Sequence, residues 1–336
     1  MVEFLMPPVL KDSDGNERRV GVELEFGDAP IKETASALQS RLGGDLRFEN
    51  PYVAHLENTP LGDLRIERDA ELLNTVPYRE WLKSLDIDFD AGTLAAELEQ
   101  GVDALSSRLV PAEVVTEPLP MSELKILHPL IEALTQLGAS GTDASWLNAY
   151  GLHFNPSVPD CEADTLTAYT QAFALLYPRF IDAGEIDKTR RWLTSYINPF
   201  PNTYLARILT PDYQPDQTGF IDDYLKDNAD RNRALDLLPL LKNIDADRVE
   251  SALPEAQRSL VKARPAFHYR LSDCRIGDPN WQIEKEWRRW WQVEQLAHDD
   301  SMRQELLSAW SKAQDDAAYL AQLDTAMAQA DWNQGG

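Results

Sequence analysis

The chain has 336 residues, and its 56 acidic residues outnumber its 32 basic ones to give a formal net charge of -24. Such a charge repels nucleic-acid phosphates and anionic lipid headgroups, which argues against nucleic acid and membrane as partners. The chain starts without a secretion signal and contains no apolar run long enough to span a bilayer. Its two cysteines, Cys161 and Cys274, lack the spacing of a zinc site. We therefore expect a cytoplasmic protein.

Residues 1–137 are expected to contain a hairpin and two helices. Turn-forming residues at 11–16 predict a hairpin whose second arm runs from Arg19 to Phe26. The Asp-x-Asp-Gly sequence in this turn lacks the later ligands of a calcium loop, so we interpret it as a turn only. Helices are predicted at 30–42 and at 122–137, the second with a kink or break ahead of Pro129.

The later part of the chain has a mainly helical pattern. Apolar residues recur at helical spacing from Ala163 to about Asn243, and one or two long helices are expected from Trp281 onward. Trp287, Trp290 and Trp291 lie at positions i, i+3 and i+4, which is typical of a helix face packed on a core.

Strands and helices are segregated along the chain, which predicts an α+β fold rather than a doubly wound sheet. We expect one main domain at residues 1–280, with a largely helical segment at 163–245 inside it. Residues 281–336 are expected to form a helical extension that packs on this domain.

Five short segments alternate apolar and polar residues as strands do. They are residues 20–26, 64–69, 112–117, 152–155 and 267–271. In the first, Val22 and Leu24 share one face, while Glu23 and Glu25 share the other, about 6.5 to 7 Å apart. In one antiparallel sheet, the five segments would present an apolar face to helices and an opposite face bearing glutamates, histidines, an asparagine and arginines. Because these residue types bind metals and phosphates, the pattern favours a functional site.

An ordinary half-exposed sheet with solvated glutamates is the alternative for each strand taken alone. Glu67 and Asp69 have a second alternative, as ion-pair partners of Arg65 or Arg68. The sequence contains no P-loop, dinucleotide-binding, nucleophile-elbow or zinc-protease motif. Any nucleotide chemistry must therefore depend on a metal-binding sheet.

Four of the segments form a set with a recognisable order. They are Gly21-Val-Glu-Leu-Glu-Phe26, Ile66-Glu-Arg-Asp-Ala-Glu71, Glu113-Val-Val-Thr-Glu-Pro118 and Gly151-Leu-His-Phe-Asn155. The set resembles the amidoligases of the carboxylate-amine ligase superfamily, which includes glutamate-cysteine ligase and glutamine synthetase. The resemblance covers roughly residues 18–275. It rests on the order of several dispersed motifs and not on one continuous signature.

The resemblance implies a curved antiparallel sheet that forms a funnel, with ATP at one end and two or three Mg²⁺ or Mn²⁺ ions held by strand carboxylates. In such enzymes ATP phosphorylates an acid to an acyl phosphate, and an amine then displaces phosphate to form an amide. The substrates would be a small-molecule or peptide acid and an amine. Their identities stay open, as does the oligomeric state, for which a homo-oligomer is one option.

The resemblance also implies roles for individual residues. The metal ligands would be Glu23, Glu25, Glu67, Asp69, Glu113 and His153, with Glu67 and Asp69 competing for one position. His153 and Arg270 would act in catalysis, and Asn155 would lie beside the bound nucleotide. Arg190 is a further catalytic candidate and Arg191, Lys262 and Arg264 are candidates for binding ATP, although a solvated helix face is the alternative for one of the adjacent arginines.

One strand departs from the family pattern. Where the family often has Glu-x-Arg on a late strand, this chain has His268-Tyr-Arg270. His268 can still bind a softer divalent ion, and a buried histidine bonded to backbone is the alternative. Two other functions stay open: a metal-dependent hydrolase, and a non-catalytic relative that binds nucleotide or protein. Residues 45–55 and 210–219 are interpreted as loops without a recognisable motif.

Overall fold

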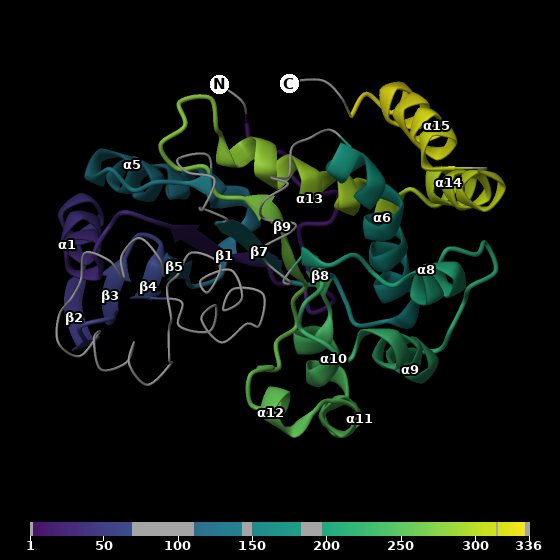
Figure 1. Ribbon diagram of the computed structural model, residues 1–336, viewed down its shortest axis with the longest axis horizontal. Helices are drawn as coiled ribbons and strands as arrows, with labels where there is room; N and C mark the ends of the chain where they lie inside the picture. Colours follow the sequence, from purple (N-terminus) through teal and green to yellow (C-terminus); the bar gives the residue numbers. More distant parts are fainter. Residues whose placement is uncertain (1–2, 69–110, 143–149, 183–196, 314, 333–336) are drawn as a thin grey trace, which may run out of the picture.

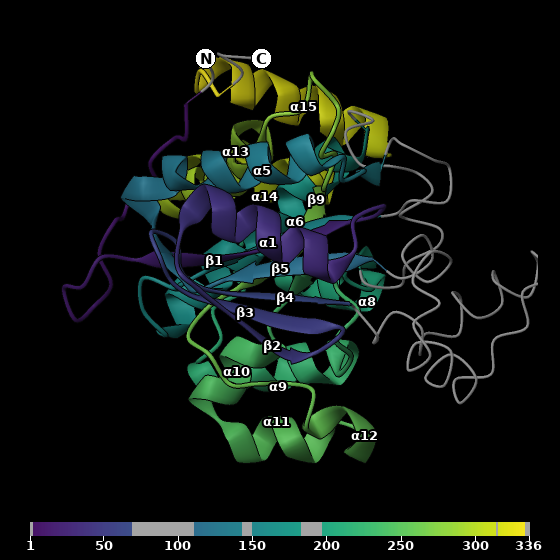
Figure 2. The same ribbon diagram turned by 90° about the vertical axis from the view of Figure 1, so that its left-hand side faces the viewer.

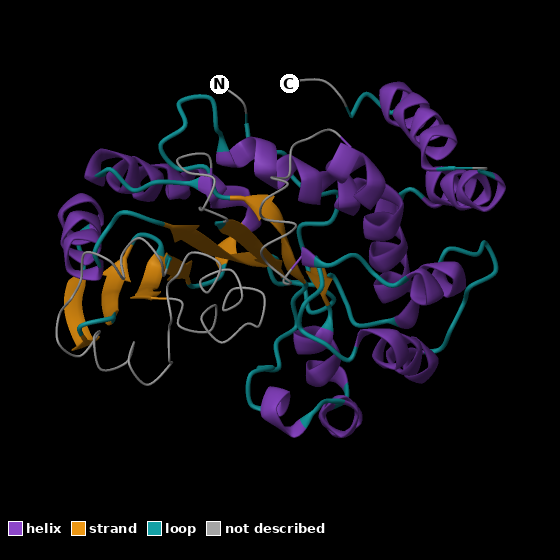
Figure 3. Cartoon of the chain, viewed as in Figure 1, coloured by secondary structure: helices purple, strands orange, loops and turns teal. Residues whose placement is uncertain are grey.

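The computed structural model describes residues 3–68, 111–142, 150–182, 197–313 and 315–332 (Figure 1). Within them the fold is α+β, as predicted, with one large antiparallel sheet and many helices (Figure 3). Among the described helices, none has both the length and the apolar character needed to cross a membrane.

The sheet contains strands from both halves of the chain. They are β1 (Arg19–Phe26), β2 (Asp45–Asn50), β3 (Val53–Thr59), β4 (Gly62–Arg68), β5 (Ala112–Thr116), β6 (Leu119–Pro120), β7 (Gly151–Pro156), β8 (Leu235–Asp236) and β9 (His268–Asp273). Their order across the sheet is β2-β3-β4-β5-β1-β7-β9-β8, and β6 pairs with β1. Strand β1 therefore lies near the middle, between β5 and β7.

The five predicted strands correspond to β1, β4, β5, β7 and β9, so the alternation identified them correctly. The interpretation of residues 45–55 as a loop is wrong, because they form β2 and the start of β3. Strand β2 lies at the edge of the sheet and is exposed along nearly its whole length. An edge strand exposed on both faces has no alternation for the sequence to reveal.

Most of the described helices lie in the predicted segments, but two short helices at 246–258 lie outside them, and three helices rather than one or two follow Trp281. The described helices are α1 (Ile31–Leu42), α5 (His128–Leu137), α6 (Ala163–Asp182), α8 (Asn202–Ile208), α9 (Gln217–Asn228), α10 (Leu238–Ile244), α11 (Ala246–Ala252), α12 (Glu255–Arg258), α13 (Ile283–His298), α14 (Asp300–Lys312) and α15 (Asp316–Gln329). The predicted break ahead of Pro129 is confirmed, since a 3₁₀ helix at Met121–Leu127 gives way there to α5.

The predicted turn is confirmed, because Asp12 accepts hydrogen bonds from the backbone of Asp14 and Asn16. The predicted second arm of the hairpin is wrong, because the described residues on either side of the turn join only through the bridge between Lys11 and Glu17, and β1 pairs with β5, β6 and β7.

Helices cover the apolar face of the sheet. Val22 and Leu24 of β1 are completely buried on this face, and Phe154 of β7 lies opposite Val22 in the strand register. Phe154 packs edge-on against Trp287 of α13 at 5.4 Å, and Trp290 packs against Tyr269 of β9 at 5.6 Å. The predicted packing of the tryptophan face is thus confirmed. Figure 2 shows α1, α5 and α13 on one side of the strands, with α10, α11 and α12 on the other.

The opposite face of the sheet is polar, and a cavity lies over part of it. The segment from α10 through α12 to β9 stands beside this face and supplies one wall of this cavity. The division of the chain into a domain at 1–280 and an extension at 281–336 stays a prediction.

Candidate active site

A row of carboxylates crosses the polar face of the sheet. Glu25 of β1 lies opposite Glu113 of β5, and Glu113 lies opposite Glu67 of β4. Two residues before Glu25 in β1, Glu23 lies opposite His153 of β7. Directly paired residues of an antiparallel sheet share a face, so the strand register alone brings these side chains together.

These side chains line one cavity of about 460 Å³. Its acidic side carries Glu23, Glu25, Glu67 and Glu113 together with His153, and its basic side carries Arg231, Lys262, Arg264 and Arg270 together with His268. Arg65 and Arg68 of β4 and Asp236 of β8 also line it. A smaller cavity of about 320 Å³ lies beside the start of α13, and its lining includes none of the predicted site residues.

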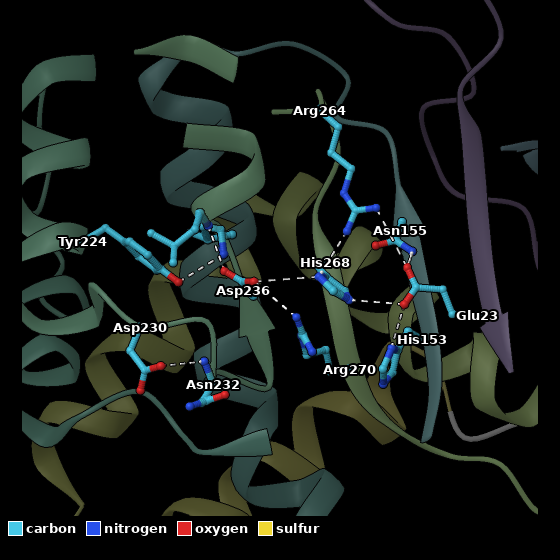
Figure 4. A network of polar contacts seen from close by, with 12 residues as sticks. Glu23, His153, Asn155, Tyr224, Asp230, Asn232, Asp236, Arg264, His268 and Arg270 are labelled. Atoms are coloured by element: carbon cyan, nitrogen blue, oxygen red, sulfur yellow. Dashed lines mark hydrogen bonds and ion pairs between the residues drawn. The ribbon is translucent and has the colours of Figure 1, made fainter. Parts of the chain in front are cut away.

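Glu23 is the centre of a polar network at the bottom of the cavity (Figure 4). Its Oε2 accepts a hydrogen bond from Nδ1 of His153 at 3.0 Å, and its Oε1 accepts one from Nδ2 of Asn155 at 2.6 Å. His268 Nε2 lies 3.7 Å from Oε2, and Arg264 Nη1 lies 3.9 Å from Oε1. The Glu23 carboxylate is therefore held from both strands that follow β1 across the sheet.

The charge states of this network follow from burial and from its neighbours. Burial favours the neutral acid, yet the charge that His268 carries when it is protonated, the hydrogen bond from His153 and the charge of Arg264 hold the pKa of Glu23 well below its usual value. Burial, aided by the charge of Arg270, holds the pKa of His268 well below its usual value. At neutral pH Glu23 is therefore a carboxylate and His268 a neutral imidazole.

Two sets of side chains have the donors and the spacing to hold a metal ion. Glu23, His153 and His268 form one set, and Glu25, Glu113 and His153 form the other, with the donor atoms of each set within 4.8 Å of one another. In the neutral tautomer whose Nδ1 donates to Glu23, Nε2 of His153 carries the lone pair, and this atom lies 3.7 Å from Glu25. Within the described residues, the buried His268 Nε2 makes no hydrogen bond. Carboxylate oxygens are the ligands that Mg²⁺ and Mn²⁺ prefer, and imidazole nitrogens suit softer divalent ions, so these mixed sets fit Mn²⁺ better than Mg²⁺.

The structure brings most of the predicted site residues together. Glu23, Glu25, Glu113, His153 and His268 meet in the metal-donor sets, while Arg270, Arg264 and Lys262 line the cavity and Asn155 holds Glu23. Glu67 lines the cavity too, but it accepts a hydrogen bond from Arg65 at 2.7 Å, the ion pair considered above as an alternative. Asp69, Arg190 and Arg191 lie outside the residues that the structure describes.

Sequence reasoning missed Asp236 and Arg231. Asp236 is 1% exposed, lies opposite His268 in the register of β8 and β9, and has one carboxylate oxygen 3.5 Å from Arg270. Burial raises the pKa of Asp236, and the charge of Arg270 opposes this rise. A signal for Asp236 existed, because it is a single acidic residue within the apolar run 234–241. Acidic residues are rarely buried without a partner.

Comparison with known families identifies the family to which most of the chain belongs. Residues 16–292 match the family described as "putative amidoligase enzyme". A search of curated proteins and a search of solved structures returned no significant match. The matched region begins just before β1 and ends within α13, so it contains every strand of the sheet and both metal-donor sets. The chain belongs to the amidoligase family.

Proposed function

We propose that this protein is an ATP- and divalent-metal-dependent carboxylate-amine ligase, which forms an amide through an acyl phosphate. The observation that carries the proposal is the convergence of Glu23, Glu25, Glu113 and His153 on one cavity whose other side is basic. The family match supports an amide-forming ligase. We further propose that the sheet is the funnel of the glutamine synthetase and glutamate-cysteine ligase superfamily, and that the enzyme works in the cytoplasm.

The two donor sets would hold the metal ions. Glu25, Glu113 and the Nε2 atom of His153 suit one ion, and Glu23 with His268 suits a second. Bound Mg²⁺ or Mn²⁺ would offset the negative charges of a triphosphate and of an acid substrate that must approach each other. Asn155 keeps the Glu23 carboxylate in place through its 2.6 Å hydrogen bond, so this ligand position is organised in advance.

The basic side of the cavity would bind the phosphates of ATP. Arg270 is 5% exposed and projects from β9 on the same face as His268, while Arg264 and Lys262 project from the segment just before that strand. Phosphoryl transfer is accelerated chiefly by positioning and by cations placed around the transferred group. Arg270, the most buried of these three, is suited to contact the γ-phosphoryl group, whereas Lys262 at the exposed rim is suited to guide the nucleotide.

The proposed reaction has two balanced steps. A carboxylate oxygen of the acid attacks the γ-phosphorus of ATP, the bond to the bridging oxygen breaks, and ADP leaves. The nitrogen of the amine then attacks the acyl carbon, phosphate leaves with the bonding electrons, and the nitrogen loses a proton. The cavity of about 460 Å³ falls within the usual range for small-molecule sites, which favours a small acid or the end of a peptide.

The test measures ADP and phosphate release with panels of acids and amines in the presence of Mg²⁺. We expect release that requires both an acid and an amine, together with an amide product detected by mass spectrometry. Turnover of an ester or amide without ATP would identify the hydrolase instead. Thermal stability that does not respond to ATP with Mg²⁺ would point to the non-catalytic relative, because a ligand that binds the native state must raise its stability.

A further inference from the structure

The histidine that faces Glu23 lies between two carboxylates. His268 Nε2 is 3.7 Å from Glu23 Oε2, and His268 Nδ1 is 3.8 Å from Asp236 Oδ2 (Figure 4). Strand pairing fixes this arrangement, since Asp236 lies directly opposite His268 and both side chains point to the polar face. Each ring nitrogen therefore has its own carboxylate.

Asp236 has one oxygen with a hydrogen-bond partner and one without. Oδ1 accepts a hydrogen bond from the backbone nitrogen of Leu238 at 2.9 Å, which fixes the orientation of the carboxylate. Within the described part of the chain, Oδ2 is buried and accepts no hydrogen bond, although Arg270 Nη2 lies 3.5 Å away. Leaving a buried charged oxygen in this state costs free energy, so such a group in a cavity calls for a functional explanation.

The contacts of Nδ1 decide what His268 can bind. Arg264 Nη2 lies 3.3 Å from Nδ1, and when it donates there, the proton of the neutral ring must sit on Nε2 and face Glu23. In the other tautomer Nδ1 carries the proton and donates to Asp236, and the Nε2 lone pair then faces Glu23 and the proposed cation. Only this second tautomer can act as a metal ligand through Nε2.

We propose that Asp236 is a positioning residue for the metal site: its Oδ2 accepts a hydrogen bond from His268 Nδ1–H and thereby fixes the tautomer whose Nε2 binds the cation with Glu23. The same oxygen holds the guanidinium of Arg270 toward the cavity, so one carboxylate orients a metal ligand and a phosphate-binding cation. This inference rests on the metal binding included in the proposed function. Carboxylates that orient metal-bound histidines in this way are a general feature of protein metal sites.

The first measurement is calorimetric titration of the full chain with Mn²⁺. We expect Asp236→Ala to weaken Mn²⁺ binding about tenfold to a hundredfold, and Asp236→Asn to weaken it less. Asp227→Asn is the matched control, because Asp227 pairs with Arg207 outside the cavity, and its Mn²⁺ affinity should equal that of the wild type.

If both Asp236 variants bind Mn²⁺ as tightly as the wild type while Glu23→Gln does not, the inference is overturned and the proposed metal site stands. If the wild type binds no Mn²⁺, both are overturned.

The second measurement reads the tautomer directly, which a purely structural role for Asp236 would not alter. Nitrogen-15 NMR of histidine-labelled protein with Mg²⁺ distinguishes the protonated ring nitrogen from the one with the lone pair, and His268→Gln identifies its signals. We expect the wild type to carry the proton of His268 on Nδ1, and Asp236→Asn to shift the population toward Nε2–H. An unchanged tautomer in the folded Asp236→Asn protein would refute the inference, and this result does not depend on Asp236→Ala being able to fold.

Discussion

Two buried clusters of charged and polar side chains, both in the described part of the chain, differ in how completely their hydrogen bonds are satisfied. Behind the sheet, Glu294 of α13 accepts hydrogen bonds from Arg18, Tyr169 and Trp290, and Arg18 also donates to the backbone oxygens of Val9 and Ser157. The side chains of Arg18 and Glu294 are completely buried. We call these residues the Arg18 cluster.

The cavity on the other face holds what we call the site cluster, defined as Glu23, His153, Asn155, Asp236 and His268. It is nearly as buried, but in the described part of the chain His268 Nε2, Asp236 Oδ2 and Asn155 Oδ1 have no hydrogen-bond partner. A buried cluster whose hydrogen bonds are all formed has no donor or acceptor left for a ligand, so its role is in the stability of the fold. A cluster with vacant donors and acceptors beside a cavity is organised for something that binds there.

Breaking the Arg18 cluster should have the largest effect, and it should act on stability. Arg18→Met leaves Glu294 buried without its cation, so we expect the free energy of unfolding in urea to fall by about 3–5 kcal/mol. Arg41→Met is the control, because the Arg41–Glu132 pair is about half exposed and its loss should cost at most about 1 kcal/mol. Adding Glu294→Leu to Arg18→Met should recover part of the loss. A cost for Arg18→Met as small as the control's would show that the cluster is not structural.

Breaking the site cluster should act on binding instead. Glu23→Gln removes a charge without changing volume, and we expect Mn²⁺ affinity to fall more than about 100-fold, beyond the effect of residues that only support a ligand. The variant should stay folded, with a smaller loss of stability than Arg18→Met. Glu33→Gln, an exposed change on α1, is the control and should leave Mn²⁺ affinity unaltered. If Glu23→Gln unfolds the protein instead, the two clusters do not differ in the way described.

The sequence predicted those members of the site cluster that the alternation of side chains along a strand can place. A period of two residues places Glu23 and Glu25 on one face of β1 and, in the same way, His153 and Asn155 on one face of β7. Because these strands lie side by side, no long-range information beyond their pairing is needed to bring the four side chains together. The predicted packing of Trp287 and Trp290 against the sheet succeeded for the same reason, since helical periodicity is also local.

The rest depends on contacts that a local pattern cannot show. Strand β8 contains only two described residues, too few for any alternation, so nothing in the sequence placed Asp236 opposite His268. The Arg18 cluster joins the residue just before β1 with residues of α6 and α13, and more than a hundred positions separate these three segments in the sequence. Such pairs form only when the whole chain folds, and no spacing rule relates them.

The pH dependence of stability should reveal how much the ionised carboxylate of Glu23 contributes to the native state. The pKa of Glu23 lies well below its unfolded value of 4.5, so its ionised form stabilises the native state above that pH. This contribution is lost as the pH falls through the native pKa. Glu23→Gln lacks it at every pH, so without metal the difference in melting temperature between wild type and variant should be largest near neutral pH and shrink on acidification. A difference that grew toward acid pH would contradict the assigned direction.

The smallest effect should come from Glu67, which tests where the metal site ends. Glu67 faces the same cavity as Glu113 and lies directly opposite it, but Glu67 is paired with Arg65 and belongs to neither donor set among the described residues. Interactions of such half-exposed charges are usually below about 1 kcal/mol, so Glu67→Gln should change Mn²⁺ affinity less than about fivefold. Glu113→Gln, the matched change one strand away, should weaken it at least about tenfold. If the two variants lose affinity equally, Arg65 must release Glu67 on metal binding, and the metal site extends across β4.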